Sequence, residues 1–150
     1  MRIAVLNGPN LNLLGTREPE LYGRVTLAEV ESRLADVGRE LDVQVTFAQR
    51  NGEGELVDLV HSLRDRVDGA VVNAGAYSHT SLALRDALAG IALPFVEVHV
   101  TNVHAREPER HRSMLASAAI GSVVGLGTYG YELALRGLVS TLRARATPRG

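Results

Sequence analysis

The chain contains the stretch Ala70-Val71-Val72-Asn73-Ala74-Gly75-Ala76-Tyr77-Ser78-His79-Thr80-Ser81-Leu82. A short apolar run ends at Asn73, a turn containing Gly75 follows, and a segment with a helical period begins at Ser81. The run has no polar face, which is typical of a strand in a parallel sheet that helices cover on both sides. The stretch therefore predicts one strand, one turn and one helix, with Ser78 or Thr80 as the cap of the helix.

The same unit recurs along the whole chain. Short apolar runs occupy residues 3–6, 43–47, 70–72, 95–100 and 122–126, and segments of helical period occupy residues 27–41, 56–67, 81–89 and 131–145. Thr26 and Glu29 form a capping-box pattern before the first helical segment. Connections this short favour right-handed crossovers. The sequence thus predicts an α/β, flavodoxin-like fold, in which helices cover both faces of a doubly wound, five-stranded parallel sheet.

The composition is that of one globular domain. Of the 150 residues, 45% are hydrophobic and 22% are charged, and the net charge is −1 at pH 7. This balance points neither to nucleic acid nor to an anionic membrane as a partner. The N-terminal apolar run ends at Asn7, which makes it too short for a secretion signal or a membrane span. We expect a single cytoplasmic domain over residues 1–150, with a frayed tail at about residues 144–150.

Two residue types are absent from the chain. It has no Cys and no Lys, so its 16 basic residues are all arginine. Without Cys there is no thiol nucleophile, disulfide or thiolate metal ligand. Without Lys there is no lysine Schiff base. Any activity must therefore come from other polar side chains or from a bound cofactor.

A long polar loop follows the first apolar run. It covers residues 7–23 and is much longer than a strand-to-helix connection needs, which is typical of lids and binding loops. Asn10 offers an amide group at the end of the strand, and Gly15 and Gly23 bracket a segment that is free to hinge. We expect a flexible lid at about residues 16–24, with a turn-rich surface loop as the alternative.

The predicted lid contains Arg17 and Tyr22. A free phenol titrates near pH ~10 and is a poor base at neutral pH. A nearby guanidinium, which stays charged, favours the phenolate and turns a tyrosine into a proton abstractor. The pair therefore predicts a general base, whereas a solvated arginine beside a packed tyrosine ring is the alternative.

A carboxylate and an imidazole alternate along the run Pro94-Phe95-Val96-Glu97-Val98-His99-Val100. Glu97 and His99 share one face of the predicted strand. A buried carboxylate needs a partner, and if it accepts from one ring nitrogen it leaves the other nitrogen free for acid–base work. A structural pair is one alternative, and a metal site that also uses His104 is another.

Further polar residues follow the predicted strands. Asn73 and His79 face the mouth of the crevice in which such folds bind ligands. Arginines further along the chain suit a carboxylate clamp, although a solvated helical face explains any one of them; they are Arg106, Arg110 and Arg112.

Residues 125–130, Gly-Leu-Gly-Thr-Tyr-Gly, have the spacing of a dinucleotide fingerprint. A true fingerprint lies in the first strand-to-helix turn and has an acidic residue about twenty positions further on. Only Glu132 is acidic beyond this segment, so we interpret it as a tight turn. The alternative function is a flavodoxin-like module that binds a nucleotide or a flavin, although an aromatic content of 4% and no Trp leave little to sandwich a flavin ring.

Together these segments resemble the type II 3-dehydroquinate dehydratases, which are hydro-lyases of the shikimate pathway for aromatic amino acid biosynthesis. The matching motifs are Asn-Gly-Pro-Asn-Leu-Asn at 7–12, Arg-Glu-Pro…Tyr-Gly at 17–23, Asn…His-Thr-Ser at 73–81, Glu-Val-His…Asn-Val-His-Ala-Arg-Glu at 97–107 and Gly-x-Gly…Gly-Tyr…Leu-Ala-Leu at 125–135. They occur in order over essentially the whole chain. The resemblance implies a single catalytic domain that dehydrates 3-dehydroquinate to 3-dehydroshikimate through an enolate, without a metal or an organic cofactor.

The resemblance also implies catalytic roles. Tyr22 would abstract the C2 proton, and Arg17 would favour its phenolate. Asn10 would hold a water that stabilises the enolate oxygen. His99, oriented by Glu97, would protonate the leaving C1 hydroxyl.

Substrate contacts and assembly follow from the same resemblance. The implied contacts come from Asn73, His79 and Arg110 on the ring hydroxyls and from Val100 and Thr101 on the carboxylate. Asp86 would reach the site of a neighbouring subunit in a dodecamer built from trimers. Ser78 and Thr101 stand where Thr and Ser are common in the family, and each keeps a hydroxyl group.

Overall fold

The structure, a computed structural model, describes residues 1–147. Its parallel strands are β1 (Arg2–Asn7), β2 (Gln44–Gln49), β3 (Gly69–Asn73), β4 (Phe95–His99) and β5 (Gly121–Val124). The helices are α1 (Pro19–Tyr22), α2 (Leu27–Glu40), α3 (Glu53–Ser62), α4 (Leu82–Gly90) and α5 (Tyr129–Ala146), with short 3₁₀ helices η1 (Leu11–Leu13), η2 (Gly75–His79), η3 (Val103–Ala105) and η4 (Pro108–Arg110). The strand order β2-β1-β3-β4-β5 is the flavodoxin-like order. The predicted fold is confirmed.

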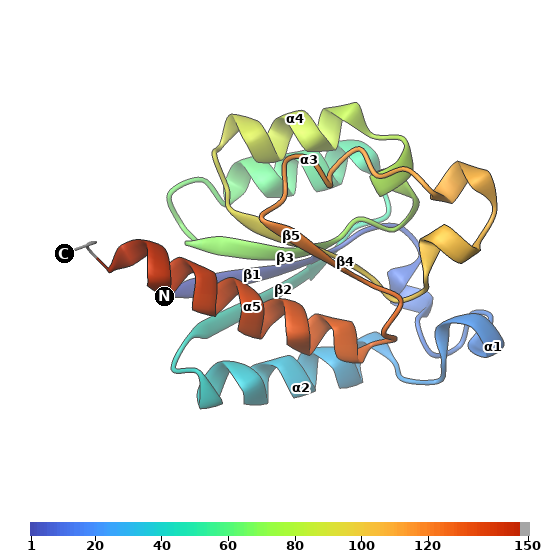
Figure 1. The fold of residues 1–150 in the computed structure, drawn as a ribbon, viewed down its shortest axis with the longest axis horizontal. Helices are drawn as coiled ribbons and strands as arrows, with labels where there is room; N and C mark the ends of the chain where they lie inside the picture. Colours follow the sequence, from blue (N-terminus) through green and yellow to red (C-terminus); the bar gives the residue numbers. More distant parts are fainter. Residues whose placement is uncertain (148–150) are drawn as a thin grey trace.

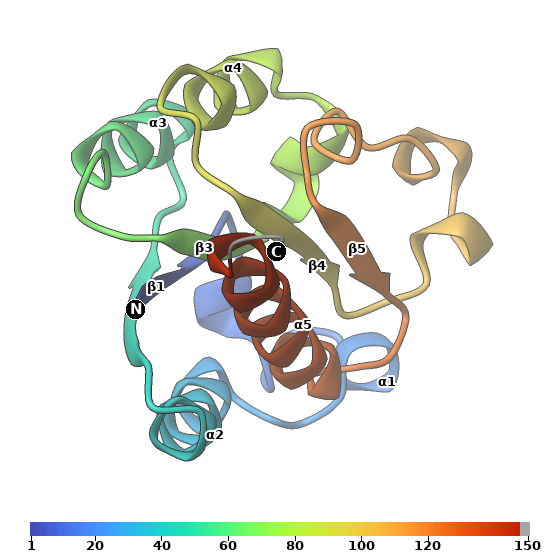
Figure 2. The same ribbon diagram turned by 60° about the vertical axis from the view of Figure 1, so that its left-hand side comes forward.

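Helices cover both faces of the sheet. Helices α2 and α5 lie on one face, and α3 and α4 lie on the other (Figure 1). Figure 2 shows the same two layers from a second direction. Val5 and Val71 pack in the core under α2 and α5, whereas Leu6 and Val72 pack in the core under α3 and α4. Successive residues of β1 and β3 thus pack into opposite cores, which is why the centres of these two strands are apolar on both faces.

The winding of the sheet reverses between β1 and β3. The chain passes from β1 to β2 on one side and from β3 through β4 to β5 on the other. Ligands bind at such a reversal in open α/β sheets, beyond the carboxyl ends of the strands. Asn7 and Asn73 are register partners at these ends. Gly8 permits the close approach there, because a Cβ at this position would lie 2.3 Å from the carbonyl oxygen of Ala74.

Helices α3 and α5 differ from the sequence prediction at their ends. The helix predicted at residues 56–67 begins at Glu53 and ends at Ser62, and Asp65 beyond its end has a positive φ of 60°. Helix α5 continues to Ala146, so the predicted tail is helical as far as that residue. The last part of the predicted tail, residues 148–150, lies outside the described residues.

The ends of α2, α4 and α5 carry local capping and turn residues. The capping box of Thr26 and Glu29 is present. Residues 125–128 form a tight turn between β5 and α5, with positive φ at Gly125 and Gly127, as predicted. The cap of α4 was predicted wrongly, because Ser81 accepts the hydrogen bond from the helix with its own hydroxyl. Within residues 1–147, no helix combines the length and the apolar character needed to cross a membrane.

Candidate active site

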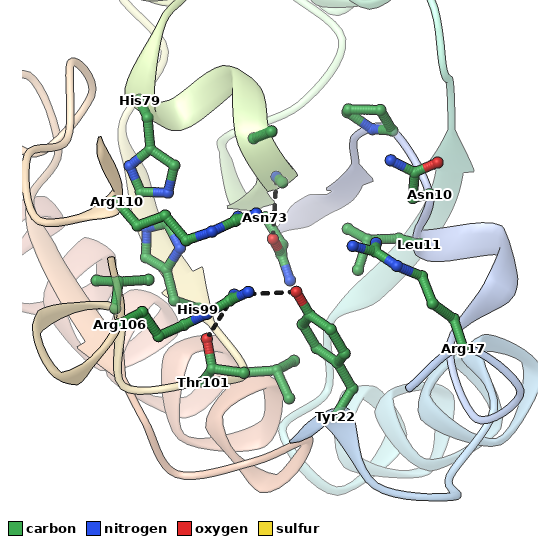
Figure 3. Close-up of a pocket in the computed structure, with 15 residues that line it drawn as sticks. Asn10, Leu11, Arg17, Tyr22, Asn73, His79, His99, Thr101, Arg106 and Arg110 are labelled. Carbon is green, nitrogen blue, oxygen red and sulfur yellow. Dashed lines mark hydrogen bonds between the residues drawn. The ribbon is translucent and has the colours of Figure 1, made fainter. Parts of the chain in front are cut away.

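A pocket opens beyond the carboxyl ends of β1, β3 and β4, and Figure 3 shows the residues that line it. Most of the predicted site residues contribute to its wall; they are Asn10, Arg17, Tyr22, Asn73, His79, His99, Val100, Thr101 and Arg110. The side chain of Arg110 reaches across the pocket toward Asn73 (Figure 3). The sheet therefore brings together residues from three loops that are far apart in sequence.

Tyr22 lies between two guanidinium groups (Figure 3). The guanidinium carbon of Arg17 is 5.0 Å from the centroid of the Tyr22 ring, and that of Arg106 is 5.5 Å from it. Arg106 also donates hydrogen bonds from Nη1 to the Tyr22 hydroxyl oxygen, at 2.9 Å, and to Thr101 Oγ1, at 3.3 Å. The positive charge of Arg106 thus lies directly at the phenol oxygen, whereas that of Arg17 lies over the ring.

The Tyr22 hydroxyl has a hydrogen-bond partner that the sequence did not indicate. The sequence pointed to Arg17 as the nearby guanidinium that favours the phenolate and to Arg106 for a carboxylate clamp. In the structure Arg17 lies over the ring and pairs with Glu18 at 3.2 Å, whereas Arg106, only 15% exposed, holds the oxygen. Arg106 and Tyr22 are 84 residues apart, so no spacing rule pairs them. The one available signal was that both follow strands whose ends meet at the same edge of the sheet.

His99 and Glu97 form a buried pair. His99 Nε2 lies 2.6 Å from Glu97 Oε1, and the side chains are 6% and 1% exposed. The alternation along β4 predicted this arrangement. His99 lines the pocket but Glu97 does not. The carboxylate therefore contacts the imidazole ring on the side that faces away from the pocket. Ser113, which the sequence did not single out, donates a hydrogen bond to the same carboxylate oxygen at 2.6 Å.

His79 stacks beside His99 in the pocket. The two ring centroids are 5.8 Å apart and the ring planes differ by 24°. His79 Nδ1 lies 2.8 Å from the backbone carbonyl oxygen of Arg112. Partial burial lowers the pKa of His79 below its ordinary value, and this outweighs the opposite effect of the Arg112 carbonyl. His79 is therefore neutral at neutral pH and offers one nitrogen as a hydrogen-bond acceptor.

Buried hydrogen bonds on the side away from the pocket fix the orientation of the Asn73 side chain. Its Oδ1 accepts from the Gly75 backbone N–H at 3.2 Å, and its Nδ2 donates to the Tyr131 hydroxyl at 2.8 Å. Tyr131 in turn donates to Asn7 Oδ1 at 2.6 Å. Burial raises the pKa of Tyr131 well above its ordinary value, so that it remains a neutral phenol. The second amide hydrogen of Asn73 is left for the pocket.

Asn10 is placed by the loop that follows β2. Its backbone lies in the left-handed region, with φ at 68°, which asparagine tolerates better than most residues. Its N–H donates to Asn51 Oδ1 at 3.0 Å. Gln49 Nε2 donates to the same Asn51 oxygen and to the Gly8 carbonyl. The sequence did not identify Asn51 and Gln49 as supports of the site.

Two predicted residues lie away from the pocket of this chain. Asp86 is exposed on α4 and does not line the pocket. His104, proposed as a metal ligand in one reading, is exposed on η3. Within residues 1–147, no group of three or more His, Asp and Glu side chains is arranged to hold a metal ion. Among the described residues that line the pocket, Tyr22 is the only Phe, Tyr or Trp, so the pocket does not favour the flavin-binding alternative.

Comparisons with known proteins agree over nearly the full length of the chain. The family model described as dehydroquinase class II matches residues 1–139. A 3-dehydroquinate dehydratase of Gemmatimonas aurantiaca is 61% identical over 145 residues, which are 97% of this chain and 95% of that protein. One from Synechococcus sp. (strain WH7803) is 57% identical over 143 residues, 95% of this chain and 97% of that protein.

Solved structures give the same result. The type II dehydroquinase of Butyrivibrio crossotus superposes with a TM-score of 0.89 at 38% identity, over 92% of this chain and 97% of that one. The type II dehydroquinase of Propionibacterium acnes superposes with a TM-score of 0.88 at 42% identity, over 93% of this chain and 96% of that one. The family indicated by the sequence motifs is confirmed, and this chain belongs to the class II dehydroquinases.

Proposed function

We propose that the protein is a hydro-lyase that converts 3-dehydroquinate to 3-dehydroshikimate in the cytoplasm, as a step of the shikimate pathway. The observation that carries this proposal is the joint placement of a base and an acid in one pocket. Tyr22 has its oxygen held by Arg106, and His99 is backed by Glu97. The names of its relatives, up to 61% identical, support the same substrate.

The proposed first step is removal of a proton from C2 of the substrate. The Tyr22 phenolate takes the proton, and the electron pair moves onto the oxygen of the C3 carbonyl to give an enolate. Asn10, at the rim of the pocket, is placed to stabilise that oxygen through a water molecule. A hydrogen-bond donor that points at the oxygen on which negative charge develops lowers the activation free energy of enolate formation.

The proposed second step is loss of the C1 hydroxyl. The enolate electrons return to form the C1–C2 double bond, and His99 gives a proton to the departing hydroxyl, which leaves as water. His79, Asn73 and Arg110 hold the ring hydroxyls. The backbone at residues 100–101 and the Thr101 hydroxyl hold the carboxylate. Each of these groups lines the pocket.

A direct assay tests the function. The product is a conjugated enone, so purified protein mixed with 3-dehydroquinate should produce an ultraviolet absorbance that the substrate lacks. In parallel samples the enzyme is first treated with substrate and borohydride, which would trap a Schiff base, and is assayed after the borohydride has been removed. Other samples are assayed with a chelator, which would remove a metal. Enone formation unaffected by either reagent is the expected result. If well-folded protein produces no enone, the proposed function is wrong.

The two arginines beside Tyr22 should differ in their effect on the pH dependence of turnover. We expect Arg17→Ala and Arg106→Ala each to move the rising limb of the kcat/KM profile to higher pH, because the phenolate loses a stabilising charge. The shift should be larger for Arg106→Ala, which also removes the hydrogen bond to the oxygen. Arg24→Ala removes an exposed charge of the same loop and is the control. An unmoved profile in both variants would count against the tuning role.

The site also includes a proposed contribution from a second subunit. We propose that the chain assembles as a dodecamer of trimers in which Asp86 enters a neighbour's pocket, and that residues 16–24 close over the substrate. The support is that Asp86 is exposed on α4 and lies away from its own pocket. Light scattering of the purified protein measures the assembly.

Mixing two defective chains tests the role of Asp86. Asp86→Ala should lower kcat/KM by about 10- to 100-fold, which corresponds to one hydrogen bond to a charged group. Tyr22→Phe chains have no base but keep Asp86. Co-expression of the two chains, with a different affinity tag on each, should yield mixed assemblies more active than either parent, because some pockets then combine an intact Tyr22 with a neighbour's Asp86. Activity equal to the average of the parents would show that Asp86 does not serve a neighbour.

A further inference from the structure

Arg112 contacts the pocket histidine His79, and Ser113 contacts Glu97, the partner of the pocket histidine His99, although neither residue lines the pocket itself. We infer that this dipeptide determines which ring nitrogen of His79 and of His99 faces the substrate, and that Ser113 is a positioning residue for the acid. The inference deepens the proposed dehydration and rests on it for its catalytic consequence. The assignment of the nitrogens rests on hydrogen-bond geometry alone.

The hydroxyl of Ser113 has only one available orientation. It accepts hydrogen bonds from the backbone N–H groups of Leu115, at 3.0 Å, and Ala116, at 3.1 Å. A hydroxyl has two lone pairs and one hydrogen. Because backbone N–H groups only donate, both lone pairs are used, and the single hydrogen points to Glu97 Oε1, 2.6 Å away. Ser113 is therefore a permanent donor to that carboxylate.

The fixed donor determines the hydrogen position between Glu97 and His99. The oxygen that accepts from Ser113 is also the one that lies 2.6 Å from His99 Nε2. An oxygen that accepts from a fixed donor is placed as an acceptor for the ring as well, so the hydrogen between this oxygen and the ring lies on Nε2. His99 Nδ1 is then the nitrogen left to act on the substrate.

Glu97 depends on Ser113 to an unusual degree. Its other oxygen, Oε2, is buried and has no hydrogen-bond partner among the residues that the structure describes. Ser113 and His99 therefore supply all the described hydrogen bonds of a carboxylate that is only 1% exposed. A buried charge is expensive unless hydrogen-bonded, so loss of the serine hydroxyl should make the ionised form of Glu97 much less favourable.

Arg112, the residue before Ser113, fixes His79 in the opposite tautomer. The carbonyl of Arg112 only accepts, so the hydrogen between it and His79 lies on Nδ1, and Nε2 is left for the pocket. The Met114 N–H donates to the Ser78 carbonyl at 2.7 Å, which ties this segment to η2, the 3₁₀ helix that carries His79. The two stacked histidines thus present different nitrogens to the pocket: Nδ1 of His99, which donates a proton when the ring is an imidazolium, and Nε2 of His79, which accepts a hydrogen bond from a substrate hydroxyl.

Ser113→Ala is expected to lower kcat by roughly 10-fold, the effect of one hydrogen bond to a charged group, with little change in KM. Without its donor Glu97 is less readily ionised and stabilises the His99 imidazolium less. The falling, alkaline limb of the kcat profile should therefore move to lower pH. Ser113→Thr keeps the hydroxyl and should restore both values. Ser117→Ala removes an exposed serine hydroxyl four residues further on and should change neither.

Solid-state ¹⁵N NMR of protein with labelled histidine tests the assignment without any substrate. At a pH high enough to leave both rings neutral, the expected spectrum of the unmodified protein shows His99 carrying its hydrogen on Nε2 and His79 carrying its hydrogen on Nδ1. Because no turnover is involved, this result is independent of the proposed dehydration, and it is available even if Ser113→Ala does not fold. Either ring in the other tautomer would overturn the inference. So would Ser113→Ala with an unchanged pH profile and a loss of thermal stability alone.

Discussion

Replacing Tyr22 with phenylalanine is expected to lower kcat by roughly 10²- to 10⁴-fold, the range that a general base contributes, while KM changes little. The substitution removes a single oxygen. The ring remains to pack between the guanidinium groups of Arg17 and Arg106. Among the described residues the hydroxyl is hydrogen-bonded only to Arg106, so the melting temperature should change little. Steady-state kinetics by enone absorbance and a thermal melt are the two measurements.

Exchange at C2 of the substrate identifies the step that is lost. In deuterated solvent, unmodified protein should exchange the C2 proton as the enolate forms and returns, and Tyr22→Phe should abolish that exchange. Tyr129→Phe removes the hydroxyl of an exposed tyrosine and serves as the matched control. Retention of most of the turnover or exchange by Tyr22→Phe would rule out Tyr22 as the base.

The fold was predictable because its signals are local or periodic. Short apolar runs such as residues 3–6 and 70–72 indicate a sheet buried on both faces, and the alternation of strands with helical segments indicates parallel crossovers. The ends of the helices were less predictable, because polar residues set them and the hydrophobic pattern does not include these residues. The first turn of α3 carries Glu53 and Glu55 before any apolar residue, so the periodic pattern begins only at Leu56. Ser81 competes with two neighbouring hydroxyl residues for the capping role, and sequence alone does not choose among them.

The site was predictable where chemistry follows directly from position on a strand. The pairing of Glu97 with His99 needs only the two-residue repeat of β4 and a reason to bury a charge. The partners that orient these groups come from elsewhere in the chain. Arg106 reaches Tyr22 across 84 residues, and Tyr131 reaches Asn7 across 124. No local pattern encodes such contacts, because they depend on which loops meet at one edge of the sheet.

Replacing His99 with alanine is expected to lower kcat by roughly 10²- to 10⁴-fold, since the C1 hydroxyl must then leave without a proton from a positioned acid. The alkaline limb of the kcat profile, which reports loss of that proton, should disappear. His104→Ala removes an exposed histidine of the segment that follows β4 and should have no such effect. The His99 variant also leaves Glu97 buried beside Ser113 alone, so its melting temperature should fall.

The same exchange experiment separates the acid from the base. Tyr22 and Arg106 are intact in His99→Ala, so C2 exchange with solvent should persist although elimination is nearly lost. Tyr22→Phe should lose both, and this difference assigns each residue to its own step. If His99→Ala loses exchange together with elimination, the imidazole serves the enolate step and is not the acid. Near-normal turnover in the variant would leave Glu97 and His99 as a structural pair, and the acid would have to be sought among the other groups that line the pocket.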